Sequence, residues 1–352
     1  MGKRRQSLRK ERQTTTTGFT SSEPVVSETH ALLELIRSTR FRFAATFALS
    51  CIGLYSLIHF LPAAFTAPIN EHTASTLGLL LNALGIYAST LRDTVSEGAL
   101  AFMIIPECTP LFTSALFLCF VTFYPASIRE KVAGLLMGIP ALYLGNLARL
   151  AATFIISRYD KRFFEVVHVY LGQVFTVALV MLAIIAWLRW LERDESNPGM
   201  PLKAAGFLGR FALISGCFFL VWIKMHPWYI AFVDQFMIFG FSLFDWKLII
   251  PRTTAVYYET FNIVTFASLV LATSWIAWSR KLKGLGVGLA ALFLLHLVHR
   301  IDNLLITGFS FVPAIRVDYV VCAVGQYVLP FVAWLMLVYR RTEGPPSYRQ
   351  AG

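Results

Sequence analysis

The stretch that decides the fold covers residues 106–172 and reads PECTPLFTSALFLCFVTFYPASIREKVAGLLMGIPALYLGNLARLAATFIISRYDKRFFEVVHVYLG. It contains two long apolar runs, and a third begins at its end. A helix that crosses a bilayer needs roughly 20 mostly apolar residues. The pattern therefore predicts membrane helices, with a cysteine, an arginine and a histidine at or just inside the ends of three of them.

The composition of the whole chain is typical of a membrane protein. Of its 352 residues, 57% are hydrophobic and 14% are charged, whereas soluble domains are about 45–50% apolar and about 25% charged. The net charge of +11 comes from short basic clusters beside apolar runs. That arrangement indicates orientation signals and not a nucleic-acid-binding stripe. We therefore expect membrane lipids, and no nucleic acid, among the partners.

The apolar runs and the breaks between them predict an all-α polytopic membrane protein with about eight transmembrane helices. The spans cover residues 42–61, 109–124, 131–156, 169–190, 207–223, 260–278, 285–306 and 319–339. Residues 74–89 and 228–258 are expected to be interfacial segments, and residues 91–106 a loop or short strand. A short amphipathic helix is expected over residues 28–36.

Lysines and arginines predict the orientation and the domain limits. If the spans alternate from a cytoplasmic N-terminus, the basic clusters face the cytoplasm, except for the loop around residues 158–162. Both termini are then cytoplasmic. The expected parts are a basic tail (1–41), a catalytic membrane domain (42–195), a linker (196–206), an associated or degenerate membrane domain (207–341) and a tail (342–352).

The two halves of the chain resemble each other and predict two parallel four-helix repeats. The sequence LGQV at residues 171–174 is echoed by VGQY at residues 324–327, and the segment containing Arg149 is echoed by the segment containing Arg300. Each unit has an even number of spans, so the repeats are parallel. Counting back from Arg300 places Glu259 where the first half has Cys108. The second half is thus expected to be degenerate, with Arg300 as its remnant.

Three residues of the opening stretch form the candidate catalytic site. Cys108 lies at a helix start, where amide groups can stabilise a thiolate, and would act as the nucleophile. His168 would take the thiol proton and return it to the leaving amine. Arg149 lies inside an apolar span, where a charge is costly without a partner or polar cavity, and would stabilise the thiolate or the oxyanion.

Further residues are expected to support this site. They share a helix face or a helix end with the candidate triad, and they are Asn146, Tyr143, Thr109 and Gly172. The five cysteines show no CxxC or other ligand spacing, so neither a metal nor a cofactor is expected.

The three motifs around these residues resemble the exosortase/archaeosortase family of membrane cysteine transpeptidases. They are Cys108-Thr109, Asn146-x-x-Arg149 and His168-x-x-x-Gly172, and the resemblance covers residues 74–190. It implies a cysteine protease or transpeptidase of the bacterial inner membrane. Its partners would be exported proteins with a C-terminal sorting signal, made of a short motif, an apolar helix and a basic cluster. The enzyme would cleave this signal outside the cytoplasm and transfer the new carboxyl end to a surface acceptor.

One departure and one special branch belong to this resemblance. The family's cysteine is usually followed by Ser or Thr and then a small residue, whereas this chain has Pro110 in place of the small residue. Within the family, the chain resembles the branch called exosortase H, because a separate membrane protein accompanies the enzymes of that branch. Residues 207–341 would then be a fused relative of that partner.

Two alternatives from other classes remain open. A non-enzymatic scaffold or transporter built from two parallel repeats would need Arg149 and Arg300 equally. A polyisoprenoid-dependent transferase would need acidic or several basic site residues, and Cys108 would be dispensable.

Overall fold

The computed structural model describes residues 39–160, 164, 167–168, 171–191, 200–247, 250 and 258–338. The amphipathic helix expected over residues 28–36 and the tail at 342–352 lie outside these ranges. The described part is mostly helical, and six of its helices are long and apolar enough to cross a membrane. They are Arg42–Phe60, Ile128–Tyr159, Gly172–Leu191, Ala205–Ser242, Trp278–Phe309 and Val312–Val338.

The first half starts with two helices and a small sheet. The helices are α2 (Thr39–Phe60) and α3 (Ala63–Ala83), and the strands are β1 (Ser89–Leu91), β2 (Thr94–Glu97) and β3 (Leu100–Met103). The strands pair antiparallel in the order β1-β2-β3. Arg92 and Gly98 have positive φ angles of 53° and 57°, as two-residue hairpin turns require. The short strand expected within residues 91–106 is confirmed by β2 and β3. Their pairing with β1 adds a small sheet to the otherwise helical fold that was expected.

The rest of the first half consists of helices around the candidate site. It contains a 3₁₀ turn η1 (Pro106–Cys108), α4 (Leu111–Phe123), α5 (Ile128–Tyr159), a π-helical turn η2 (Leu171–Phe175) and α7 (Thr176–Leu191). A capping box, in which Ser127 and Glu130 bond each other's backbone amides, starts α5. Lys131 closes the preceding turn by donating to the Thr122 carbonyl at 2.7 Å.

From its 3₁₀ turn onward, the described part of the second half follows a similar order of elements. It contains α8 (Met200–Ser242), η3 (Tyr258–Phe261), α9 (Asn262–Ala272), α10 (Trp278–Phe309), α11 (Val312–Ala323), a π-helical turn η4 (Val324–Val328) and α12 (Leu329–Val338). Helices α5 and α10 both have 32 residues. Lys281 donates to the Leu271 carbonyl at 3.3 Å, as Lys131 does to Thr122. The recurring order agrees with the similarity between the two halves of the sequence.

Three of the expected spans differ from the observed helices. Helices α4 and α9 have only 13 and 11 residues, so they rise roughly 20 Å and 16 Å across a hydrocarbon core of about 30 Å. The span at 207–223 and residues 228–242 of the expected interfacial segment instead belong to one helix, α8, of 43 residues. Asp234 does not break α8, because the Arg300 guanidinium binds its carboxylate at 2.6 Å.

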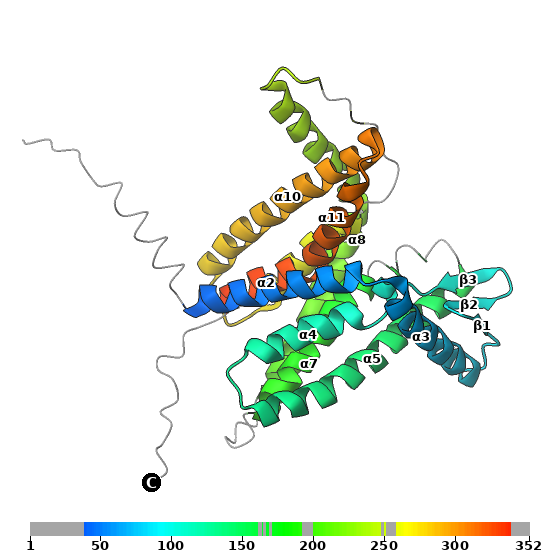
Figure 1. Ribbon diagram of the computed structural model, residues 1–352. Coiled ribbons are helices and arrows are strands. Elements are labelled where there is room, and N and C mark those ends of the chain that lie inside the picture. The colour runs from blue at the N-terminus through cyan, green and yellow to red at the C-terminus, as the bar shows by residue number, and fades with distance from the viewer. Residues whose placement is uncertain are drawn as a thin grey trace, which may run out of the picture.

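One apolar core joins the two halves. It collects buried side chains from α2, α4, α7, α8, α9, α10 and α12. The rings of Phe47 on α2 and Phe331 on α12 lie 5.6 Å apart, and the Tyr55 hydroxyl on α2 donates to the Phe112 carbonyl on α4 at 2.8 Å. Figure 1 shows α2 lying across the bundle, with α3 and the sheet at one end of it. The halves are thus packed together through α2.

Candidate functional site

The backbone around Cys108 is fixed by a tight turn. Cys108 ends η1, and its N–H donates to the Ile105 carbonyl at 2.8 Å. The Thr109 hydroxyl donates to the Pro106 carbonyl at 2.6 Å and accepts the N–H of Leu111 at 3.4 Å. Thr109 therefore shapes the turn that leads into α4, and Pro110 is the residue that precedes this helix.

Two side chains of α5 hold the Cys108 carbonyl. Asn146 donates Nδ2–H to it at 2.8 Å and Arg149 donates Nη2–H at 3.2 Å. Arg149 Nε also donates to Asn146 Oδ1 at 3.1 Å. All three residues are buried, and hydrogen bonds from a charged donor are stronger than neutral ones. The structure thus brings Cys108, Asn146 and Arg149 together, with the two helix residues on the backbone of the cysteine.

The surroundings of the Cys108 thiol are apolar. Side chains of α3, the sheet and α5 form one cluster with it, including Leu77, Val95, Leu147 and Phe154. Burial raises the pKa of the Cys108 thiol, and the nearby Arg149 charge opposes that rise. Cys108 is therefore mainly a neutral thiol at pH 7, and it needs a base to become a nucleophile.

His168 lies just before η2 and is neutral at pH 7. Its ring stacks on Phe164 with centroids 5.2 Å apart, and Phe164 packs against Phe102 of the sheet at 5.0 Å. Burial lowers the pKa of His168 to about 4, and the positive charge of Arg149 lowers it further. A neutral imidazole can accept a proton. Among the described contacts, no hydrogen bond joins His168 to Cys108.

Tyr143 and Gly172 have different places. The Tyr143 hydroxyl donates to Thr76 Oγ1 on α3 at 3.0 Å, and its ring stacks on His72, so Tyr143 ties α5 to α3. Gly172 faces the site: a Cβ there would lie 3.6 Å from Arg149 Nη1. The glycine thus keeps one face of the guanidinium without a side chain.

Sequence reasoning missed a residue from the second half that reaches this site. Tyr327 in η4 directs its hydroxyl to the Gly172 carbonyl at 3.4 Å, and it lies within range of the charge of Arg149. Its position in the VGQY echo was visible, but nothing in the sequence shows that it faces the first half.

The residue of the second half that corresponds to Arg149 also differs from the expected one. Helices α5 and α10 start 150 residues apart, at Ile128 and Trp278, and end 150 residues apart. This register pairs Arg149 with His299, not with Arg300. The second half has its own cysteine and histidine, at other positions than Cys108 and His168: Cys322 Sγ lies 3.3 Å from His299 Nδ1.

The fold and the site define a polytopic membrane protein with a cysteine held by a buried arginine. Residues 25–184 match the family model of transmembrane exosortases (Exosortase_EpsH), and this part of the chain belongs to the transmembrane exosortase family. The match includes Cys108, Arg149 and His168 and ends before α8. Comparisons with curated proteins and with solved structures gave no match.

Proposed function

We propose that the chain is a cysteine endopeptidase or transpeptidase of the bacterial inner membrane. It cleaves the C-terminal sorting signal of exported proteins at the extracytoplasmic face and transfers the new carboxyl end to a surface acceptor. The observation that carries this proposal is the contact of Asn146 and Arg149 with the Cys108 carbonyl at 2.8 Å and 3.2 Å. The family of residues 25–184 supports the same class of reaction.

In the proposed reaction, His168 acts as a general base. The neutral imidazole takes the thiol proton while Cys108 Sγ attacks the scissile carbonyl, and a tetrahedral intermediate with one oxyanion forms. Arg149 lies beside the cysteine, and the missing side chain of Gly172 leaves space next to Nη1. An oxyanion in that space is stabilised by the guanidinium. Its collapse expels the amine, which takes the proton from His168, and leaves a thioester on Cys108.

The thioester is then resolved by an acceptor nucleophile or by water. His168 takes the proton of this second nucleophile, and the thiol leaves as the new acyl bond forms. Asn146 and Arg149 bind the backbone carbonyl of Cys108, so the main chain that carries the attacking sulfur stays in place through both steps.

The proposed topology has both termini in the cytoplasm and two parallel four-helix units. Helices α4 and α9 count as short crossings, and Cys108 precedes α4 at the outer face. A membrane-impermeant thiosulfonate reagent should label Cys108 from outside, in a chain whose other cysteines are replaced by serine. Labelling from the cytoplasmic side alone contradicts this topology.

The function is tested by replacing Cys108 and following the size of an exported reporter with a C-terminal sorting signal. We expect Cys108→Ala and Cys108→Ser to reduce processing by a factor of at least ~10³. Cys217→Ser, at an exposed free cysteine, is the matched control and should process normally. Normal processing by both Cys108 variants would sink the proposal and favour a transferase or a non-enzymatic membrane protein.

A further inference from the structure

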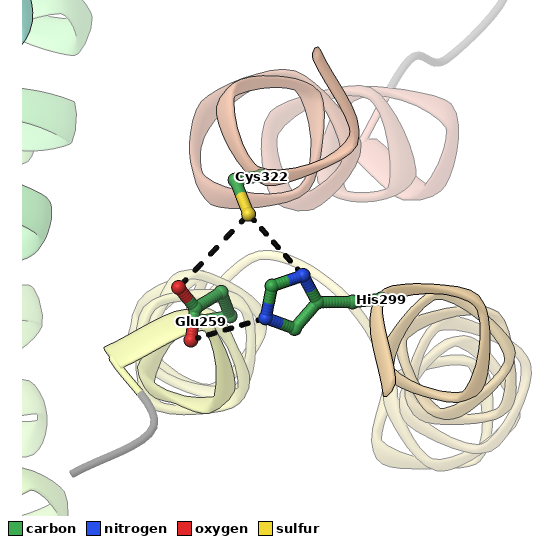
Figure 2. Close-up of side chains that lie close together, drawn as sticks. All are labelled: Glu259, His299 and Cys322. Atoms are coloured by element: carbon green, nitrogen blue, oxygen red, sulfur yellow. Dashed lines mark hydrogen bonds and ion pairs between the residues drawn. The ribbon is translucent and has the colours of Figure 1, made fainter. Parts of the chain in front are cut away.

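A second polar cluster lies in the other half of the chain, at the equivalent place. The first site uses η1, α5 and the segment that leads into η2. The second cluster consists of Glu259 in η3, His299 in α10, and Asp318 and Cys322 in α11, directly before η4. Figure 2 shows Glu259, His299 and Cys322 converging from three separate elements. The fold thus positions a sulfur, a nitrogen and carboxylate oxygens together.

The distances in this cluster are those between neighbouring ligands of one ion. His299 Nε2 lies 3.5 Å from Glu259 Oε2, and Cys322 Sγ lies 3.9 Å from Glu259 Oε1. One ligand atom from each of the three residues lies within 4.8 Å of the other two. Tetrahedral coordination at about 2.0–2.3 Å places ligand atoms roughly 3.3–3.7 Å apart. The Cys322 thiol, which lies 3.3 Å from His299 Nδ1, has to turn toward Nε2 to complete a coordination sphere with Glu259.

A carboxylate orients the histidine. Asp318 Oδ1 lies 2.6 Å from His299 Nδ1. With the imidazole N–H on Nδ1, facing this carboxylate, Nε2 on the side of Glu259 keeps its lone pair. Histidines that bind metals usually donate their other N–H to such a carboxylate. The Cys322 thiol also touches Nδ1, at 3.3 Å, and Asn303 Nδ2 lies 3.2 Å from Nε2.

The charge of the cluster favours a cation. Asp302 is 8% exposed, and its Oδ2 is buried with no hydrogen-bond partner among the described residues. It lies within range of the charges of Asp318 and His299. The adjacent Arg300 does not neutralise these acids, because Asp234 binds it at 2.6 Å and 3.0 Å. Glu259, Asp302 and Asp318 thus outnumber the one histidine among them, and an excess of buried acidic groups is costly in a membrane protein.

We propose that Glu259, His299 and Cys322 bind one divalent transition-metal ion of the Zn²⁺ class, with Asp318 as the positioning residue of His299. A thiolate and an imidazole select Zn²⁺ over Mg²⁺ or Ca²⁺, which prefer oxygen ligands. A cavity of about 10 Å³, lined in part by Tyr229, Glu259 and His299, has room for one water molecule or ion beside these side chains. The bound ion ties η3, α10 and α11 together. Its binding does not depend on the chemistry of Cys108.

The first test measures metal binding by the purified full-length protein. After chelation and dialysis, a Zn²⁺ titration against a competing dye should give one site per chain. We expect Cys322→Ser and Glu259→Gln to lose this site, and Asp318→Asn to weaken it by ~10–100-fold. Cys108→Ser and Cys217→Ser are matched controls that should bind normally. Co²⁺ should give a thiolate-to-metal charge-transfer band in the wild type, and Cys322→Ser should lack it.

The second test uses the unmodified chain, so it does not depend on the folding of any variant. Zn²⁺ should slow the alkylation of Cys322 by a small thiol reagent at least tenfold, as measured by peptide mass spectrometry. The exposed Cys217 should react at the same rate with and without Zn²⁺. Equal alkylation of Cys322 under both conditions overturns the proposal, as does a Zn²⁺ stoichiometry that Cys322→Ser leaves unchanged.

Discussion

The cluster around Cys108 and the cluster around His299 occupy the same place in the order of elements, but their charges differ. In the first, Arg149 is the charged group that contacts the cysteine backbone. In the second, Arg300 is bound by Asp234, and Glu259 and Asp318 surround His299. A positive group beside a thiol favours thiolate and oxyanion states. An acidic group of ligands favours a cation.

This difference shows that one helical framework positions two polar clusters of opposite charge. Helix α5 directs Asn146 and Arg149 to η1, and α10 directs His299 to η3. The backbone positions are shared, so the chemistry depends on which side chains occupy them. The halves are best distinguished by experiments that apply the same change to both.

The largest difference is expected from the two arginines. Arg149→Gln removes the cation beside the reacting carbonyl and should reduce processing by ~10²–10³-fold per folded protein. Arg300→Gln should process within a few-fold of the wild-type rate per folded protein, because Arg300 contacts Asp234 and not the cluster around Cys108.

The control for this comparison is Arg149→Lys, which keeps the charge but loses the planar fork. Its activity should lie between those of the wild type and Arg149→Gln. Equal losses for Arg149→Gln and Arg300→Gln contradict the asymmetry and favour a scaffold or transporter with two equivalent halves.

The Arg300–Asp234 pair should instead govern stability. Removing one partner of a buried pair leaves an unpaired charge and costs about 3–5 kcal/mol. For Arg300→Gln we expect a loss at the low end of this range, because 17% of the Asp234 side chain is exposed. Unfolding in mixed micelles measures this loss. The double variant Asp234→Asn/Arg300→Gln should recover part of it, and strict additivity of the two single losses contradicts the pair.

The pH dependence of processing tests the proposed base. With the pKa of His168 lowered to about 4 by burial and then by Arg149, the imidazole stays neutral down to that pH. Processing should therefore change little between pH 7.5 and pH 5.5, whereas an ordinary histidine would cause a roughly tenfold loss. An acid limb near pH 6.5 in the wild type contradicts the buried environment of His168.

The same pKa shift predicts how His168 affects stability. The unfolded imidazole binds a proton below about pH 6.5, and the folded one only below about 4. The unfolded state thus binds more protons between these values, so this residue lowers stability as the pH falls through that window. His168→Gln should remove this part of the pH dependence, with the unfolding midpoint in micelles as the measurement.

The sequence predicted many residues of the cluster around Cys108 and few of the cluster around His299. Cys108, Asn146, Arg149 and His168 were identifiable because polar residues near the ends of apolar runs stand out. The contacts among these residues were not identifiable from the sequence, since the hydrogen bond from Asn146 to the Cys108 carbonyl joins residues 38 positions apart. Hydrophobic patterns report local helices, not which carbonyl a side chain meets across the bundle.

The second cluster was hidden for a related reason. Cys322 lies in an apolar run and is separated from Glu259 by 63 residues and from His299 by 23, so no ligand spacing is visible. The one-residue error that aligned Arg149 with Arg300 followed from matching short motifs. The length of α8 was missed because the partner of Asp234 lies on another helix.

The smallest effect is expected at Tyr327, where the second half meets the first site. Tyr327→Phe removes the hydrogen bond to the Gly172 carbonyl, and such a bond contributes about 0.5–1.5 kcal/mol, or roughly 2–12-fold in rate. The loss should appear in kcat, because Tyr327 positions η2 and does not bind substrate. KM and the pH dependence of processing should stay unchanged. Tyr319→Phe on α11, whose ring stacks on His59, is the matched control and should have no effect. Equal kinetics of both variants contradict a role for the second half in the first site.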